Sequence, residues 1–176
     1  MRIISGEWRG RRISAPKGDA VRPTLDRVRE AWMSMVHTSL PDARVLDLFA
    51  GSGALGLEAL SRGAEWVDFV ENDPRAFRVL QENARSLEAG ARCALHQEDA
   101  LAFLDRIPAG TGGTLRYGIA FADPPYRSRL ATTLADGWLK QPFAAIFGVE
   151  HEALEQLPAG GDTRRYGDTS ITIYRT

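Results

Sequence analysis

The sequence predicts a doubly wound α/β fold, in which helices cover both faces of a mostly parallel sheet. Short apolar segments of strand length alternate with segments of helical periodicity along most of the 176 residues. A glycine-rich turn follows the first apolar segment, at the place where a strand would turn into a helix. The last two strand-like segments follow one another without a helix between them, which indicates an antiparallel hairpin at the C-terminal end.

The individual elements follow from these patterns in order. Residues 2–14 alternate apolar and basic stretches around two glycines, which predicts a hairpin or an extended arm. A helix is expected from Thr24, since apolar side chains recur at helical spacing from Leu25 to Val36. Strands are then expected at 44–50, 65–71, 91–96, 117–122, 144–150, around 166 and at 171–174, with helices at 54–61, 74–88, 100–107 and 129–139.

Charge is unevenly distributed along the chain. Residues 1–30 carry eight Lys and Arg against four Asp and Glu, a net charge of +4, whereas the remainder carries 14 against 19, a net charge of −5. A basic segment on an acidic body attracts polyanions, so contact with a nucleic acid is expected at the N-terminal end. We therefore divide the chain into a basic hairpin or arm, residues 1–22, and a main domain, residues 23–176.

Composition disfavours several classes of protein. Cys93 is the only cysteine and the three histidines are scattered, so neither a disulfide nor a zinc site is expected. No apolar run approaches the roughly 20 residues that cross a bilayer, and the first residues lack the apolar core of a signal peptide. We expect a cytoplasmic protein that binds no metal and no membrane, with a monomer as the default. Cys93 itself is expected to be buried in its strand.

The glycine-rich turn bears on the choice of ligand. Gly51, Gly53 and Gly56 fit the G-x-G-x-x-G pattern of dinucleotide-binding folds, and Glu71 lies where a ribose-binding acid is expected. A nicotinamide cofactor would bring a pyrophosphate close to Asp47, whose negative charge would repel it. S-adenosylmethionine has no phosphate and carries an ammonium group and a sulfonium, so Asp47 favours this cofactor. A tight turn without a ligand is the alternative.

Acidic residues also close the next two strands. Glu71 is expected to accept hydrogen bonds from two ribose hydroxyls, although a solvent-exposed acid would fit the same place. Asp99 either meets the adenine together with Ala100 or caps the following helix, and both roles can coexist. The predicted cofactor-binding residues are Asp47, Phe49, Gly51, Gly53, Glu71, Asn72, Asp99 and Ala100.

The sequence Asp123-Pro124-Pro125-Tyr126 follows the strand expected next to the first one. We expect this corner and the glycine turn to open onto one crevice. An aromatic amine is a poor nucleophile because its lone pair is delocalised, and rigid acceptors such as the Asp123 carboxylate and the Pro124 carbonyl would favour its pyramidal form. Tyr126 offers a face for stacking of the target base. These four residues are the predicted catalytic group, and a plain turn is the alternative.

These motifs carry a resemblance to a known family. Residues 47–53 with 123–126 resemble class I amino-methyltransferases that act on nucleic acids, and residues 2–12, 22–30 and 166–174 are similar to the bacterial RsmD family. The resemblance implies a seven-stranded, Rossmann-like class I methyltransferase sheet, mostly parallel with a C-terminal antiparallel hairpin. It also implies S-adenosylmethionine as cofactor and methylation of the N2 amine of a guanine in 16S rRNA, with 16S rRNA or the small ribosomal subunit as partner.

RNA contact is predicted at the basic N-terminal end. Trp8 is expected to stack on an unpaired base while the neighbouring arginines meet phosphates, and a solvated basic hairpin is the alternative. The predicted RNA-binding residues are Arg2, Trp8, Arg9, Arg11, Arg12, Arg22 and Arg27.

Other functions remain open at this point. A DNA adenine-N6 or cytosine-N4 amino-methyltransferase would use the same corner, but the chain has no spare length for a target-recognition region. Methylation of protein glutamine is usually associated with Asn in place of Asp123. A non-catalytic ribosome-assembly binder with the same fold would tolerate the loss of Asp123.

Overall fold

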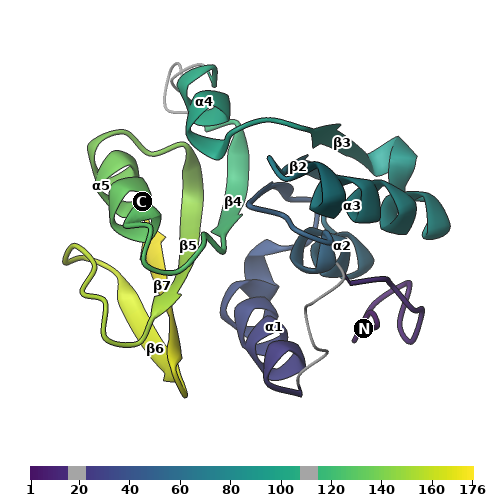
Figure 1. The fold of residues 1–176 in the computed structure, drawn as a ribbon, viewed down its shortest axis with the longest axis horizontal. Coiled ribbons are helices and arrows are strands. Elements are labelled where there is room, and N and C mark those ends of the chain that lie inside the picture. Colours follow the sequence, from purple (N-terminus) through teal and green to yellow (C-terminus); the bar gives the residue numbers. More distant parts are fainter. Residues whose placement is uncertain (16–22, 108–114) are drawn as a thin grey trace.

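A computed structural model describes residues 1–15, 23–107 and 115–176 of the chain. Its seven-stranded sheet has the strand order β3-β2-β1-β4-β5-β7-β6 (Figure 1). The strands are β1 (Arg44–Leu48), β2 (Trp66–Val70), β3 (Cys93–His96), β4 (Tyr117–Ala122), β5 (Ala144–Glu152), β6 (Asp162–Tyr166) and β7 (Thr169–Arg175). The first five run parallel, whereas β7 is antiparallel to both β5 and β6. The predicted doubly wound sheet with a C-terminal antiparallel hairpin is confirmed.

Helices cover both faces of the sheet. They are α1 (Pro23–Val36), α2 (Ala54–Ser61), α3 (Pro74–Ser86), α4 (Ala100–Asp105) and α5 (Leu130–Lys140). Apolar side chains alternate between the faces along each central strand, as the period of two requires. In β4, Ile119 and Phe121 join the core under α1, α2 and α3, while Ala120 and Ala122 join the core under α4 and α5.

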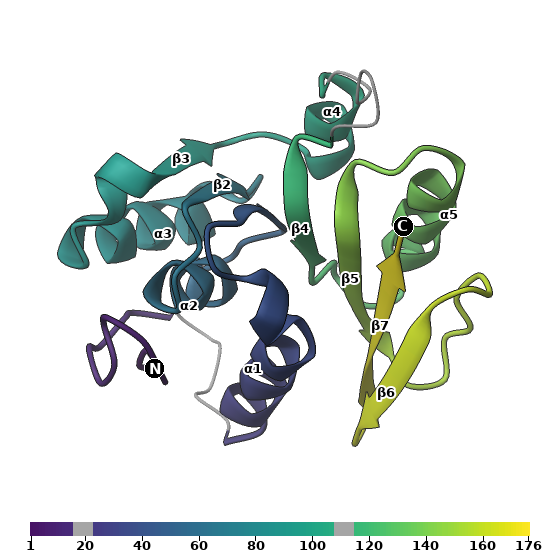
Figure 2. The same cartoon turned by 180° about the vertical axis from the view of Figure 1, so that it is seen from behind.

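The order of the strands fixes where a ligand can sit. β1 pairs with β2 on one side and with β4 on the other, so the winding direction reverses between β1 and β4. In such sheets the carboxyl ends of the strands at this switch point leave a crevice. The turn after β1 and the corner after β4 both lie at that edge. At the other end of the sheet, β7 and β6 form the edge remote from β3 (Figure 2).

Three details differ from the sequence-based expectations. The strand expected at 91–96 begins only at Cys93, because a short 3₁₀ helix, Ala89–Arg92, occupies the preceding residues. Cys93 is only partly buried, contrary to prediction, since β3 lies at the edge of the described sheet, where it pairs with β2 alone. A second 3₁₀ helix, His37–Ser39, extends α1 and was not expected. Among the described residues, no helix has the length and apolarity needed to cross a membrane.

Candidate active site

A cavity of about 210 Å³ opens at the switch point of the sheet. Gly51 from the turn after β1 and Asp123 from the corner after β4 both line it, so the expected shared crevice is confirmed. Asp47 and Phe49 lie in the same wall. The helix α1 also lines the cavity, through Trp32.

Asp47 provides a buried carboxyl group at the end of β1. Its side chain is 3% exposed, and Oδ2 accepts a hydrogen bond of 2.9 Å from the backbone N–H of Gly56 in α2. Burial raises the pKa of Asp47 to about 7, against the lowering effect of the Gly56 bond, and the nearby charge of Glu71 adds to the rise. A cation bound in this cavity would relieve that penalty. The electrostatics therefore fit a positively charged ligand and oppose a phosphate.

The glycine turn adopts a backbone that requires glycine. Gly53 has φ +79°, and a Cβ at this position would lie 2.4 Å from Cδ1 of Leu80 in α3. Gly53 donates to the carbonyl of Ala50 at 2.7 Å, which closes the turn. Phe49 also has a positive φ, +59°. Such conformations are costly outside glycine and are held only by the surrounding structure.

A second cavity, of about 470 Å³, continues past Phe49. Its walls include Glu71, Asn72, Asp99 and Ala100, which are the residues predicted for the ribose and the adenine. Phe49 lines both cavities. An elongated ligand with a cationic end can thus extend from Asp47, across Phe49, to the loops after β2 and β3.

Glu71 and Asp99, the two acids predicted for the cofactor, have backbone partners. Glu71 accepts hydrogen bonds of 2.7 Å from the N–H groups of Gly51 and Asp73, one on each carboxylate oxygen. Asp99 is the N-cap of α4 and accepts from Leu101 and Ala102 at 3.0 Å. The capping interpretation of Asp99 is therefore confirmed. Each oxygen of Glu71 keeps a second lone pair that can face a ligand, whereas in Asp99 both bonds fall on Oδ1 and Oδ2 accepts neither of them.

The corner after β4 presents alternating buried and exposed residues. Pro124 is buried, whereas Asp123 and Pro125 are exposed. The Tyr126 side chain is 48% exposed, and its hydroxyl donates a hydrogen bond of 3.3 Å to Oε1 of Glu150. Burial of the hydroxyl end, more than the nearby acids, raises the pKa of Tyr126. The exposed ring is available for stacking.

Glu150 is a member of the site that the sequence analysis missed. It is 8% exposed, lies near the end of β5 and lines the first cavity with Asp123. Trp32 Nε1 donates to its Oε2 at 3.3 Å, and the Thr169 hydroxyl donates to Oε1 at 2.9 Å. A signal was present in the sequence, since Glu150 follows directly on an apolar strand, as Asp123 does.

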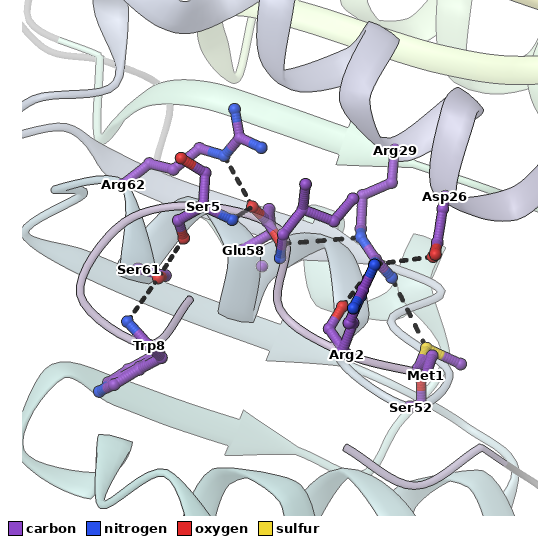
Figure 3. Close-up of polar contacts among 12 residues, drawn as sticks. Met1, Arg2, Ser5, Trp8, Asp26, Arg29, Ser52, Glu58, Ser61 and Arg62 are labelled. Atoms are coloured by element: carbon purple, nitrogen blue, oxygen red, sulfur yellow. Dashed lines mark hydrogen bonds and ion pairs between the residues drawn. The ribbon is translucent and has the colours of Figure 1, made fainter. Parts of the chain in front are cut away.

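The N-terminal residues form a hairpin that packs against α2. Arg2 and Arg12 make an antiparallel bridge, and the backbone N–H groups of Ile4 and Ser5 donate to the two oxygens of Glu58 at 2.8 and 2.9 Å (Figure 3). Glu58 is fully buried. Ile3, Trp8 and Ile13 belong to the same core as the helices α1, α2 and α3.

The expectation that Trp8 stacks on RNA is wrong for this structure. The Trp8 side chain is only 5% exposed, its backbone N–H donates to Ser61 Oγ at 2.9 Å, and the Arg92 guanidinium lies 4.9 Å from the ring centroid. The indole ring packs in the hydrophobic core because the hairpin folds back on α2. The other predicted RNA-binding residues with described side chains are exposed: Arg2, Arg9, Arg11, Arg12 and Arg27. Arg22 lies outside the described residues.

Arg29 connects the hairpin to the cavity. It is 5% exposed and donates through Nη2 to the carbonyl of Arg2 at 2.7 Å and to Asp26 at 3.0 Å (Figure 3). Its Nε lies 3.7 Å from Glu58 Oε2 and has no hydrogen-bond partner within the described part of the chain. Burial lowers the pKa of Arg29. A guanidinium therefore lines the same cavity as Asp47.

The strand order, the glycine turn and the corner after β4 define a class I methyltransferase. A family model described as "Conserved hypothetical protein 95" matches residues 1–175. The chain therefore belongs to this family, which is the RsmD family. "Ribosomal RNA small subunit methyltransferase D" of Escherichia coli K12 is 40% identical over 163 residues, covering 90% of this chain and 78% of that protein. The Haemophilus influenzae protein of the same name is 34% identical over 183 residues, covering 99% and 92%.

Solved structures agree with this family. A hypothetical protein of Thermus thermophilus superimposes with a TM-score of 0.83 at 33% identity, over 100% of this chain and 99% of that one. A Haemophilus influenzae protein described as a methylase gives a TM-score of 0.78 at 29% identity, over 99% and 97%. The match covers both the N-terminal hairpin and the C-terminal strands.

Proposed function

We propose that this protein methylates the exocyclic N2 amine of a guanine in 16S rRNA, with S-adenosylmethionine as methyl donor. One observation carries the proposal. The buried Asp47 of the glycine turn and Asp123 of the Pro-Pro corner line a single cavity, where a donor and an acceptor can meet. The names of the relatives, which are ribosomal RNA small subunit methyltransferases, support an rRNA substrate. An rRNA substrate implies action in the cytoplasm.

The residues of the two cavities fit the cofactor from end to end. Asp47 suits the ammonium group, and the guanidinium of Arg29 suits the carboxylate of the same amino-acid end. Glu71 and Asn72 suit the ribose, and Asp99 with Ala100 suits the adenine. Phe49, Gly51 and Gly53 shape the connection between the two cavities. The sulfonium supplies an activated methyl group, so the protein has mainly to align the acceptor.

The corner after β4 holds the acceptor base in this proposal. The Asp123 carboxylate and the Pro124 carbonyl accept hydrogen bonds from the two amine protons, and they are fixed before charge develops on the nitrogen. Pro125 stiffens the corner because its φ is restricted. The exposed ring of Tyr126 stacks on the base once it has left its helix.

The exposed arginines of the hairpin form the proposed RNA contact. Four of these arginines belong to the hairpin: Arg2, Arg9, Arg11 and Arg12. The fifth, Arg27, lies in α1. Their charge contrasts with the acidic remainder of the chain, which supports contact with phosphates at this end. Residues 1–22 are proposed as the RNA-binding part and residues 23–176 as the methyltransferase domain, with Arg22 included on sequence grounds. The protein is proposed to act as a monomer without a metal ion.

The decisive experiment maps modified nucleotides in rRNA from cells that lack the protein. We expect the loss of one N2-methylguanosine from 16S rRNA, and its return when the gene is restored. Intact rRNA modification with altered DNA methylation would favour a DNA amino-methyltransferase instead. Unchanged methylation of both nucleic acids, with a defect in subunit assembly, would favour a non-catalytic binder.

A further inference from the structure

We propose that Glu150 makes this site selective for guanine, by accepting a hydrogen bond from the ring N1–H beside the methylated amine. The inference rests on the base methylation proposed above and adds to it the residue that chooses the base. Neither the glycine turn nor the Pro-Pro corner supplies such a choice, because both suit any exocyclic amine.

The sheet places Glu150 beside Asp123. In the β4–β5 ladder Phe121 pairs with Gly148 and Ala122 with Val149, and Asp123 and Glu150 each follow directly on this last pair. Neighbouring strands lie about 4.8 Å apart, and registered residues of parallel strands point to the same face. Both side chains line the same cavity. A planar base whose amine reaches Asp123 can therefore place its ring N1 toward Glu150.

The surroundings of Glu150 leave it an acceptor. Its described hydrogen-bond partners are three donors: the Trp32 indole N–H, the Thr169 hydroxyl and the Tyr126 hydroxyl. The two hydroxyls donate to Oε1, whereas Trp32 is the only one of these described partners that donates to Oε2. A carboxylate oxygen can accept two hydrogen bonds, so Oε2 retains one acceptor position.

Trp32 fixes the position of this carboxylate. Its ring packs edge-on against Phe121 with centroids 5.3 Å apart, and it lies over Gly148 so closely that a Cβ there would be 2.1 Å from Cζ3. The indole N–H consequently points at Glu150 from a ring that is only 1% exposed. A positioned and largely buried acceptor discriminates between ligands more strongly than a mobile one.

The chemistry of the bases makes such an acceptor selective. In guanine the ring nitrogen N1, bonded to the carbon that carries the exocyclic amine, bears a proton. The amine and N1–H are therefore adjacent donors. In adenine and cytosine the corresponding ring nitrogen is a lone-pair acceptor. A flipped base is recognised by the hydrogen bonds of this edge. Glu150 would bind guanine and repel the lone pair of the other two bases.

The test compares two bases at the mapped target position of the RNA. 2-Aminopurine keeps the amine of guanine but has a lone pair in place of N1–H. The wild-type protein is expected to methylate the guanine RNA with a kcat/KM roughly 10- to 100-fold above that of the 2-aminopurine RNA. Because 2-aminopurine also lacks O6, the diagnostic quantity is the change of this ratio between variants.

Glu150→Gln is the informative variant. Its amide oxygen can keep the position of Oε2 and accept from Trp32, while its NH₂ group can donate to the hydroxyls of Thr169 and Tyr126, so the packing can be kept. The acceptor for N1–H then loses its negative charge, which weakens its bond to guanine and its repulsion of the 2-aminopurine lone pair. The ratio is expected to fall by roughly 10-fold, with cofactor affinity unchanged. Glu152→Gln is the matched control, since it removes the same charge two residues further along β5, from a side chain paired with Arg127. That control is expected to keep the wild-type ratio.

The outcomes separate the possible roles. If Glu150→Gln slows both substrates equally and leaves the ratio unchanged, Glu150 only supports Tyr126 and Trp32, and the inference is wrong. An equal fall of the ratio in Glu152→Gln would also overturn it, because general charge would then explain the selectivity. If the wild-type protein methylates neither RNA, the proposed function itself fails.

Discussion

The carboxylate of Glu71, at the end of β2, accepts a hydrogen bond of 2.7 Å from the backbone N–H of Gly51 in the turn after β1. Its other oxygen accepts from Asp73 at the same distance. One side chain thus ties the glycine turn to the start of α3 while facing the second cavity. Glu71, which is proposed to bind the ribose, therefore also holds the glycine turn, which is proposed to shape the cofactor site between the two cavities.

Glu71→Gln should therefore weaken cofactor binding, because it changes both the proposed partner of the ribose and a hydrogen bond that holds the glycine turn or the start of α3. An amide offers one acceptor oxygen, so either Gly51 or Asp73 would face an NH₂ donor in place of an acceptor. The cost of such a mismatch is about 1–3 kcal/mol, which corresponds to a Kd for S-adenosylmethionine raised roughly 5- to 150-fold. Isothermal titration calorimetry measures it, with Glu82→Gln on the exposed side of α3 as control. An unchanged Kd would remove Glu71 from the cofactor site.

Asp47→Asn should make stability and function respond in opposite directions. The native pKa of Asp47 is about 7 against 3.8 for the free group, so the contribution of this group to stability is present at acid pH and lost as the pH rises through 7. Asn keeps an acceptor for Gly56 and does not ionise. The variant should gain up to about 3 kcal/mol over the wild type between about pH 5 and pH 8, since one pKa unit is about 1.4 kcal/mol.

Denaturant unfolding of both proteins at the two pH values measures this difference. Titration with S-adenosylmethionine should at the same time show weaker binding by Asp47→Asn, because the partner of the ammonium group has lost its charge. A variant that binds the cofactor as well as the wild type would mean that Asp47 has no electrostatic role in binding.

Asp123→Ala should separate binding from turnover. The cofactor residues lie elsewhere in the two cavities, so affinity for S-adenosylmethionine should be retained. Turnover should fall by on the order of a hundredfold or more, as for other fixed acceptors of a developing charge. Single-turnover methylation of the target RNA gives the rate. Asp162→Ala, an exposed acid in β6, is the control, and near-normal turnover of Asp123→Ala would exclude the proposed role.

Arg9→Ala combined with Arg11→Ala tests the RNA contact of the hairpin. Each phosphate contact that is lost lowers the slope of log affinity against log salt by about 0.7 to 0.9, so the double variant should show a slope shallower by roughly 1.5. Binding to the RNA over a range of salt concentrations measures the slope. Arg164→Ala with Arg165→Ala in β6 removes the same charge from another exposed strand. The same slope in wild type and hairpin variant would assign the phosphate contacts to another surface.

Features of the site could be predicted from the sequence where neighbouring residues carry the signal. The glycine turn and the Pro-Pro corner were predicted because each follows directly on an apolar strand, and the switch-point rule then brought them together. Trp8 was misjudged because its aromatic ring between arginines looks the same whether the hairpin extends into solvent or folds onto α2. Glu150 also follows an apolar segment, but a single acid there forms no motif, and its significance comes from its position beside Asp123 in the cavity.

The role of Glu58 was not predicted either, because its partners in the N-terminal hairpin are distant from it in the sequence. Its buried carboxylate accepts from Ile4, Ser5 and Arg62, and it lies 3.7 Å from the Arg29 guanidinium. Glu58→Gln keeps the size of the side chain but leaves Arg29 short of countercharge and one backbone N–H without an acceptor. Breaking a buried ion pair costs about 3–5 kcal/mol, and unfolding in denaturant should show a loss of this order. Limited proteolysis should cut the N-terminal hairpin faster in this variant than in the wild type. Glu65→Gln, an exposed acid before β2, serves as control, and stability equal to the wild type in Glu58→Gln would mean that the hairpin is held by its apolar contacts alone.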